Sequence, residues 1–310
     1  MRPRWHIAVL PIVLLLAAAI AWLAWREFRP DESAARLLGA LPRAPVNGIK
    51  SEEASAQFYI DAGALRRSGL LDSIAGSEAS EEPDYRQFVA ATGFDYRRDL
   101  DAVAASFAAG DMYVAARGNF DEKRLADYAR SQHGDCAGSL CWMPASRANR
   151  YISFRPIGRR VLALAQTTDP RGASRIALSN PKPPVEIPSV AVWISAPGSV
   201  FRDLSGWPDG SHILSPLADA QQVSFTVDGK QIQLDALCGS PDLAASVVLR
   251  FTATTNLLRN MLQREKLTPD PSNLSGVLVA GKFESRGLHA LGSWPLGKQF
   301  MESLFSGKTR

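Results

Sequence analysis

The chain has 310 residues, of which 46% are hydrophobic and 21% are charged, as is typical of a folded globular protein rather than a disordered chain. It carries 35 basic and 31 acidic residues, which gives a formal net charge of +4. No run of lysine and arginine reaches four residues, so the sequence lacks the basic footprint expected of a nucleic-acid-binding protein.

An uncharged apolar segment, IAVLPIVLLLAAAIAWLAW, occupies residues 7–25. Four arginines bracket it: Arg2, Arg4, Arg26 and Arg29. A helix of this length is about 28 Å long, which matches the hydrocarbon thickness of a bilayer. Trp22 and Trp25 at its end are typical of a membrane interface. We predict that residues 1–25 form an N-terminal transmembrane anchor, which contacts the lipid bilayer through residues 7–25.

The alternative to a retained anchor is a cleaved signal peptide, with residues 17–19 or 19–21 as the small-residue site. The apolar run continues past both sites to Trp25, which favours the anchor. By the positive-inside rule, the flanking charges slightly favour an N-terminus on the cytoplasmic side of the membrane. Together with the cysteine pair described below, they predict a single-pass protein of the inner (cytoplasmic) membrane. Its C-terminal body is expected in the periplasm or outside the cell.

Residues 26–54 are predicted to form a juxtamembrane stalk with a helix over residues 31–41. A first α+β domain is expected over residues 55–179. Its predicted elements are a strand at 57–61, a helical segment at 62–76, a helix at 84–92, strands at 102–107 and 112–117, a helix at 121–131, a hairpin of 151–154 and 160–165, and a short helix near 170–178.

Cys136 and Cys141 frame a short glycine-containing loop, HGDCAGSLCWMP. We predict a structural disulfide between them, which would contribute about 2 kcal/mol and requires an oxidising compartment. The alternative is a pair of free thiols in a cytosolic loop. A zinc site fits poorly, because no second Cys or His pair has metal-ligand spacing.

Residues 180–188, NPKPPVEIP, contain four prolines and predict a linker between domains. A second α+β domain is expected over residues 189–310. Its predicted elements are a strand at 189–196, a hairpin of 222–227 and 231–237 turning at Asp228-Gly229, a long helix with Ser240 as N-cap and Pro241 as its first residue, strands around 277–283, and a closing helix that opens at Ser293-Trp294-Pro295, packs Leu296, Phe300 and Leu304, and ends at Gly307.

The same order of strand, helices, two strands, helix, hairpin and helix is thus expected twice. We predict an α+β fold in which a single transmembrane helix is followed by two similar, mainly antiparallel sheet-and-helix domains, with helices on one face of each sheet. An internal duplication would explain the repeated order. Coincidence of generic α+β patterning is the alternative, because few residues are identical between the halves.

Three carboxylates, Asp95, Asp99 and Asp101, lie within seven positions and could hold a cation or act in acid–base catalysis. Arg97 and Arg98 stand where a calcium-binding loop needs oxygen ligands. We therefore prefer the interpretation that these aspartates cap turns or pair with neighbouring arginines.

Other reactive side chains give no convergent site. His133 lies near Cys136 and would form a nucleophilic pair with it only if that cysteine were reduced. Cys238 is expected to be a buried small residue at a strand end. Because no catalytic, cofactor-binding or metal-binding motif is present, we assign no catalytic residue, cofactor or metal.

The stretch TGFDYRRDLD at residues 92–101, the segment Arg117-Gly118-Asn119-Phe120-Asp121 and the cysteine loop together resemble uncharacterised bacterial envelope proteins that carry a domain of unknown function. The resemblance would cover most of residues 55–305. It implies an envelope location and brings no known active site to transfer.

The leading hypothesis is a membrane-tethered extracytoplasmic binding or scaffold protein of unknown ligand, with an envelope protein as partner. It is motivated by the anchor and by the absence of a catalytic motif. The first alternative is a membrane-anchored envelope hydrolase whose site assembles from sequence-distant residues. The second is an assembly factor that acts partly through the anchor helix.

Overall fold

The computed structural model describes residues 30–42, 56–69, 71, 83–108, 110–178, 190–202, 211–228, 230–270, 272–297 and 300. The predicted anchor at residues 7–25, the Pro-rich linker at residues 180–188 and Leu304 lie outside these residues. In the part of the chain that the structure describes, no helix is both long enough and apolar enough to cross a membrane.

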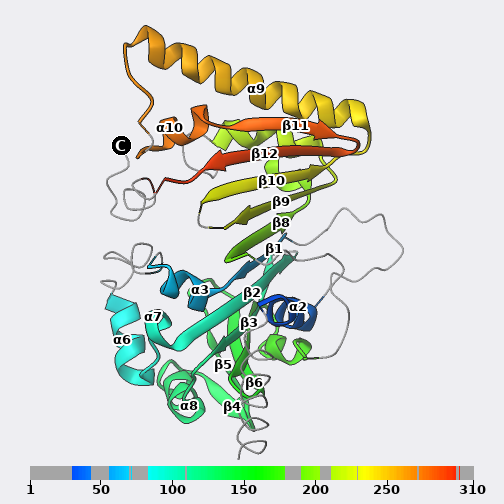
Figure 1. The fold of residues 1–310 in the computed structure, drawn as a ribbon. Helices are drawn as coiled ribbons and strands as arrows, with labels where there is room; N and C mark the ends of the chain where they lie inside the picture. The colour runs from blue at the N-terminus through cyan, green and yellow to red at the C-terminus, as the bar shows by residue number, and fades with distance from the viewer. Residues whose placement is uncertain are drawn as a thin grey trace, which may run out of the picture.

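One antiparallel sheet of 12 strands runs the length of the molecule (Figure 1). The first seven strands are β1 (Ala56–Ile60), β2 (Leu100–Ala108), β3 (Asp111–Gly118), β4 (Asp135–Ala137), β5 (Leu140–Pro144), β6 (Tyr151–Gly158) and β7 (Val161–Thr167). The remaining five are β8 (Val192–Ala196), β9 (Gln222–Val227), β10 (Gln231–Leu237), β11 (Lys282–Arg286) and β12 (His289–Pro295).

Short helices and one long helix connect and cover these strands. The α-helices are α2 (Pro30–Ala40), α3 (Ala62–Arg67), α6 (Pro83–Thr92), α7 (Tyr96–Asp99), α8 (Glu122–Ser131), α9 (Pro241–Arg264) and α10 (Leu274–Val279). The 3-10 helices of the described residues are η1 (Gly172–Arg175), η2 (Gly198–Phe201) and η3 (Ser211–Asp219).

The predicted fold class is wrong in its division into two sheet-and-helix domains, because β1 pairs directly with β8 and makes the sheet continuous. The strand order is β11-β12-β10-β9-β8-β1-β2-β3-β7-β6-β5-β4. Across the junction Phe58 faces Ile194 and Tyr59 faces Trp193. Tyr59 and Trp193 are 1% and 2% exposed, so this junction is part of the core and not a contact between separate bodies.

The two sides of this junction follow the same strand order. On one side the order from the junction outward is β1-β2-β3-β7-β6, and on the other it is β8-β9-β10-β12-β11. In each, a helix follows the third strand along the chain, α8 after β3 and α9 after β10. The extra hairpin β4–β5 extends the first side beyond β6.

Helices cover both faces of the first half of the sheet, whereas one covered face was predicted. Successive residues of β3 show this, because side chains of a strand alternate between faces. Ala115 belongs to the same buried cluster as Leu37 of α2. Ala116 lines a cavity with Leu125 of α8. Helices α2 and α8 therefore lie on opposite faces.

The long helix α9 covers the same face as α8, in the second half of the sheet. Directly paired residues of neighbouring strands point to the same face of the sheet. The pairs Ala104–Tyr59, Tyr59–Trp193 and Trp193–Thr226 therefore place all four side chains on the face that α2 covers. Phe225, next to Thr226, points to the other face and packs against the cluster that contains Phe251 of α9.

Many local elements lie where the sequence predicts them. The hairpin β9–β10 has the predicted bounds. Helix α9 begins at Pro241, and the hydroxyl of Ser240 accepts a hydrogen bond from the Leu243 amide at 3.2 Å. The segment predicted as a short helix near residues 170–178 is a 3-10 helix over four residues.

Two predictions near the C-terminus are wrong. Residues 277–279, the start of the segment expected as strand over 277–283, form the end of helix α10, because the side chain of Asn273 accepts from the Gly276 amide and caps the helix while Val277 and Val279 are buried. The last two residues of that segment, 282–283, lie in strand β11 as predicted. Ser293 and Trp294, expected to open a helix, lie in β12, where pairing with β10 and burial of Trp294 hold the extended chain.

Candidate functional site

The cysteine segment, predicted as a loop, forms the hairpin β4–β5. Cys136 and Cys141 face each other across the two strands, with Cα atoms 4.0 Å apart and sulfurs at bonding distance, 2.10 Å. The predicted disulfide is present in the structure. Gly138 adopts φ +63° in the turn between the strands, a conformation that favours glycine.

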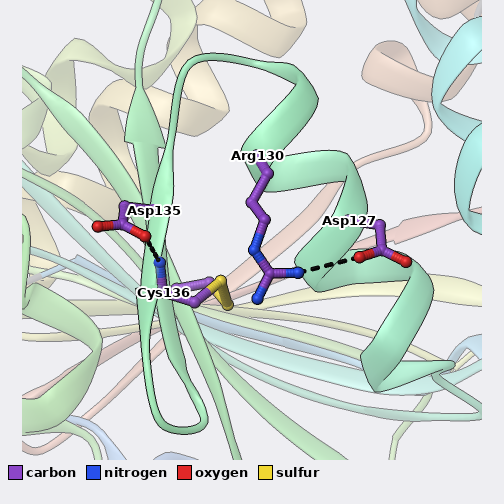
Figure 2. Close-up of a disulfide and its surroundings, with 5 residues drawn as sticks. Asp127, Arg130, Asp135 and Cys136 are labelled. Carbon is purple, nitrogen blue, oxygen red and sulfur yellow. Dashed lines mark hydrogen bonds and ion pairs between the residues drawn. A yellow bond between two sulfur atoms is a disulfide. The ribbon is translucent and has the colours of Figure 1, made fainter.

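The disulfide lies against helix α8 (Figure 2). Cys141 is 3% exposed and shares a buried cluster with Leu125 and Ala129 of that helix. On the helix, Arg130 and Asp127 point toward each other and form an ion pair of 2.9 Å. The Asp135 side chain accepts a 2.7 Å hydrogen bond from the Cys136 amide. The bridge thus holds the hairpin in one register against the helix.

An apolar cavity of about 200 Å³ lies between this part of the sheet and helices α6 and α8. No polar atom of its lining faces the cavity. Its lining residues come from helices, loops and five strands: Phe88, Phe94, Leu100, Ala116, Phe120, Leu125, Tyr128, Met143, Ile152, Phe154, Leu162 and Leu164. We call this cavity the aromatic pocket.

Contacts between aromatic rings hold together the side of the aromatic pocket that faces away from the sheet. Phe94 and Phe120 stack with centroids 4.9 Å apart and an interplanar angle of 15°. Phe88 meets Tyr128 edge-on at 5.2 Å. Such pairs add about 0.5–1.5 kcal/mol each beyond burial, so the wall is held by its own contacts.

A second cavity of about 220 Å³ adjoins the aromatic pocket beneath the cysteine hairpin. Gly138, Ser139 and Cys141 line it, and Glu122 and Lys123 of α8 place charged groups beside it. Three residues line both cavities and form the partition between them: Leu125, Phe154 and Leu162.

The acidic cluster forms capping and ion-pair contacts, as the preferred interpretation of the sequence predicts. Asp95 caps α7 and accepts from the Arg97 amide at 2.9 Å. Asp99 accepts from the Asp95 amide at 2.9 Å. The other contacts are ion pairs, Arg98–Asp99 at 2.8 Å and Arg160–Asp101 at 3.0 Å. These contacts use the carboxylates to fold the turn that presents Phe94.

Two pKa shifts mark this turn. The hydrogen bond from Arg98 holds the pKa of Asp99 below its ordinary value, although burial acts in the opposite direction. Burial, together with the 3.0 Å hydrogen bond that its hydroxyl donates to Asp95, raises the pKa of Tyr85 to about 12. Tyr85 is therefore a neutral donor that fixes α6 to the turn.

The remaining sequence candidates do not converge. His133 is exposed in the turn after α8, and Cys136 is held in the disulfide, so the nucleophilic pair is not formed. Cys238 is 0% exposed at the end of β10, as predicted. Burial raises the pKa of its thiol.

A pair that the sequence did not indicate joins Asp235 of β10 to His289 of β12, with Oδ1 and Nδ1 2.7 Å apart. Both side chains are about half exposed. In the part of the chain that the structure describes, no hydroxyl or thiol is hydrogen-bonded to the other ring nitrogen of His289. Among the described residues, no group of three or more His, Cys, Asp or Glu is placed to hold a metal ion.

The aromatic pocket was missed from the sequence because its lining comes from elements spread over residues 88–164. The usable signal was the number of aromatic residues flanking the acidic cluster, such as Phe88, Phe94 and Phe120. Their spacing follows no single helix or strand, so pairing of the strands was needed to bring them together.

Comparisons with known proteins leave the family open. The sequence matches no family model and no curated protein. Among solved structures two chains match. One belongs to "Structure of crystal form I of TP0453", at 11% identity over 82% of this chain and 94% of that chain, with a TM-score of 0.43. A likeness at this level transfers no site and no activity.

Proposed function

We propose that the chain is a non-enzymatic binding protein of the bacterial envelope that takes a small apolar group of its ligand into the aromatic pocket. The observation that carries the proposal is the lining of that pocket, which presents no polar atom to the cavity. An apolar cavity of about 150 Å³ stays dry and accepts benzene, so about 200 Å³ suits one ring or a short hydrocarbon.

Two separate features support the proposed location. Residues 7–25 have the length and composition of a membrane span, with N-terminus inside as the proposed orientation. The disulfide of the β4–β5 hairpin fits a body outside the reducing cytoplasm. We propose a single-pass protein of the inner membrane with its body on the outer side.

The pocket is testable with toluene as a neutral, ring-sized probe and thermal unfolding of the full-length protein as the readout. A ligand at ten times its dissociation constant adds about 1.4 kcal/mol to the free energy of unfolding. This raises Tm by about 3–6 °C for a body of this size. Ala116→Leu fills the cavity from its β3 wall, where Ala116 is 6% exposed. We expect this variant to fold and to lose the toluene-dependent rise.

Ala90→Leu is the matched control, because it adds the same atoms at an exposed position of α6. It should keep the full response to toluene. A toluene-dependent rise of equal size in Ala116→Leu would place binding elsewhere and remove the pocket from the proposed function.

A further inference from the structure

Helix α9 lies at the end of the molecule, along edge strand β11 (Figure 1). Its inner side is buried through Ala244, Val247, Phe251 and Thr255. Its 24 residues make it about 36 Å long, so its outer side is a straight and extended surface.

The outer side of α9 exposes large apolar side chains. Leu249 is 70% exposed, Leu257 61% and Met261 49%. With Ala253 they follow at intervals of four residues, so they form one stripe along the helix. Leu267, just beyond the helix, is 53% exposed. Isolated exposed leucines need no explanation, but an aligned stripe is typical of a contact surface.

Beyond its first turn, helix α9 carries charges of one sign only. Between Leu243 and Arg264 the helix holds three arginines, Arg250, Arg259 and Arg264, and no acidic residue. Arg250 faces Asp219 at 3.6 Å, with both side chains about half exposed. Arg259 donates to the Val279 carbonyl at 2.8 Å. Acidic residues stand at the ends only, at Asp242 and Glu265.

We propose that the outer side of α9 docks in the plane of an anionic bilayer surface, with the leucine stripe at the acyl boundary and the arginines among the headgroups. A long helix with an apolar stripe flanked by arginine is the pattern of interfacial helices, and arginine stems reach the headgroups over apolar surface. Anionic lipid attracts such cations. A second copy of this chain fits less well, because it would bring the same arginines together.

This inference rests on the proposed membrane location but not on the pocket. The test uses the full-length chain with an environment-sensitive fluorophore on Leu257→Cys. The native Cys238 is 0% exposed and the other two cysteines are bridged, so labelling is directed to residue 257. The protein is mixed with vesicles of phosphatidylcholine, with or without phosphatidylglycerol. Flotation reports tethering by any part of the chain, and the emission reports the surroundings of α9.

We expect a blue-shifted emission with phosphatidylglycerol vesicles, reversed by high salt. A label on exposed Ala90→Cys of α6 should not shift. The double variant Arg250→Gln/Arg264→Gln, which leaves the buried side of the helix unchanged, should need at least tenfold more phosphatidylglycerol vesicles for the same shift.

Three outcomes would overturn the inference. Flotation without a shift would leave the tether in place and refute docking by α9. An equal shift with both vesicle compositions would refute the charge argument. A blue shift that appears without vesicles and grows with protein concentration would show that the outer side of α9 contacts a second copy of the chain. A failure to float would separately contradict the proposed membrane location.

Discussion

The β1–β8 junction predicts that the two halves of the sheet unfold as one unit. The informative change is Trp193→Ala, because Trp193 is 2% exposed and faces Tyr59 across the junction. Folding buries about 200 Å² of the surface of an aromatic side chain of this kind, which is equivalent to about 5 kcal/mol of transfer free energy. Measured Trp→Ala changes in cores cost about 3–5 kcal/mol, so we expect a loss of about 4 kcal/mol.

The assay is native-state hydrogen exchange of the full-length protein, read separately in β6–β7 and in β10–β12. In a continuous sheet the opening free energy should fall by the same amount in both regions, because global unfolding exposes both. Ile194→Ala is the matched control on the same strand. Ile194 is 44% exposed, so its truncation should cost about 1–2 kcal/mol.

The reasoning would be refuted if Trp193→Ala weakened protection in β10–β12 and left β6–β7 unchanged. That result is the one expected of two independently folding domains. It would mean that the β1–β8 ladder adds no cooperativity, although its side chains are buried.

The remaining predictions concern the region around the aromatic pocket. Cys136→Ser/Cys141→Ser should lower the free energy of unfolding by about 2 kcal/mol, which is the loop-closure contribution of a crosslink across so few residues. Reduction of the native protein by a dithiol should lower Tm by the same amount as the double variant does. A double variant as stable as the native protein would show that the bridge adds nothing to the hairpin. Tyr85 should ionise near pH 12 in the folded protein, seen as tyrosinate absorbance that Tyr85→Phe removes. Because the folded pKa lies above the ordinary value of 10.0, the contribution of Tyr85 to stability is complete below pH 10 and is lost as pH rises toward 12. Ionisation of Tyr85 together with the exposed tyrosines would contradict its proposed role.

Local signals predicted local structure well in this chain. Ser240 followed by Pro241 predicts the start of α9, because a hydroxyl cap and a residue without an amide proton suit the first turn. The Cys136–Cys141 disulfide also follows from a short spacing. The strand predicted from residue 277 onward failed at residues 277–279 because Val277 and Val279 favour strand by propensity but are buried in helix α10 by tertiary packing.

Long-range pairing could not be predicted in the same way. The sequence predicts a strand at 57–61 and another at 189–196, but no feature of either segment indicates that the two strands pair with each other. Their antiparallel register joins residues more than 130 positions apart, Gln57 with Ser195 for example. The aromatic pocket depends on the same kind of information, because Phe94 and Phe154 come to line one cavity only after the strands are ordered.

An open sheet of this width leaves two edge strands, β11 and β4, at opposite ends of the molecule (Figure 1). Unpaired edges invite pairing with another chain and so promote aggregation. Strand β4 offers only three residues, Asp135–Ala137, tied to β5 by the disulfide. Strand β11 exposes Lys282, Glu284 and Arg286, and the last two form an ion pair of 2.6 Å. Both ends thus resist growth of the sheet from one molecule into the next, which keeps a protein with twelve consecutive strands from polymerising through its edges.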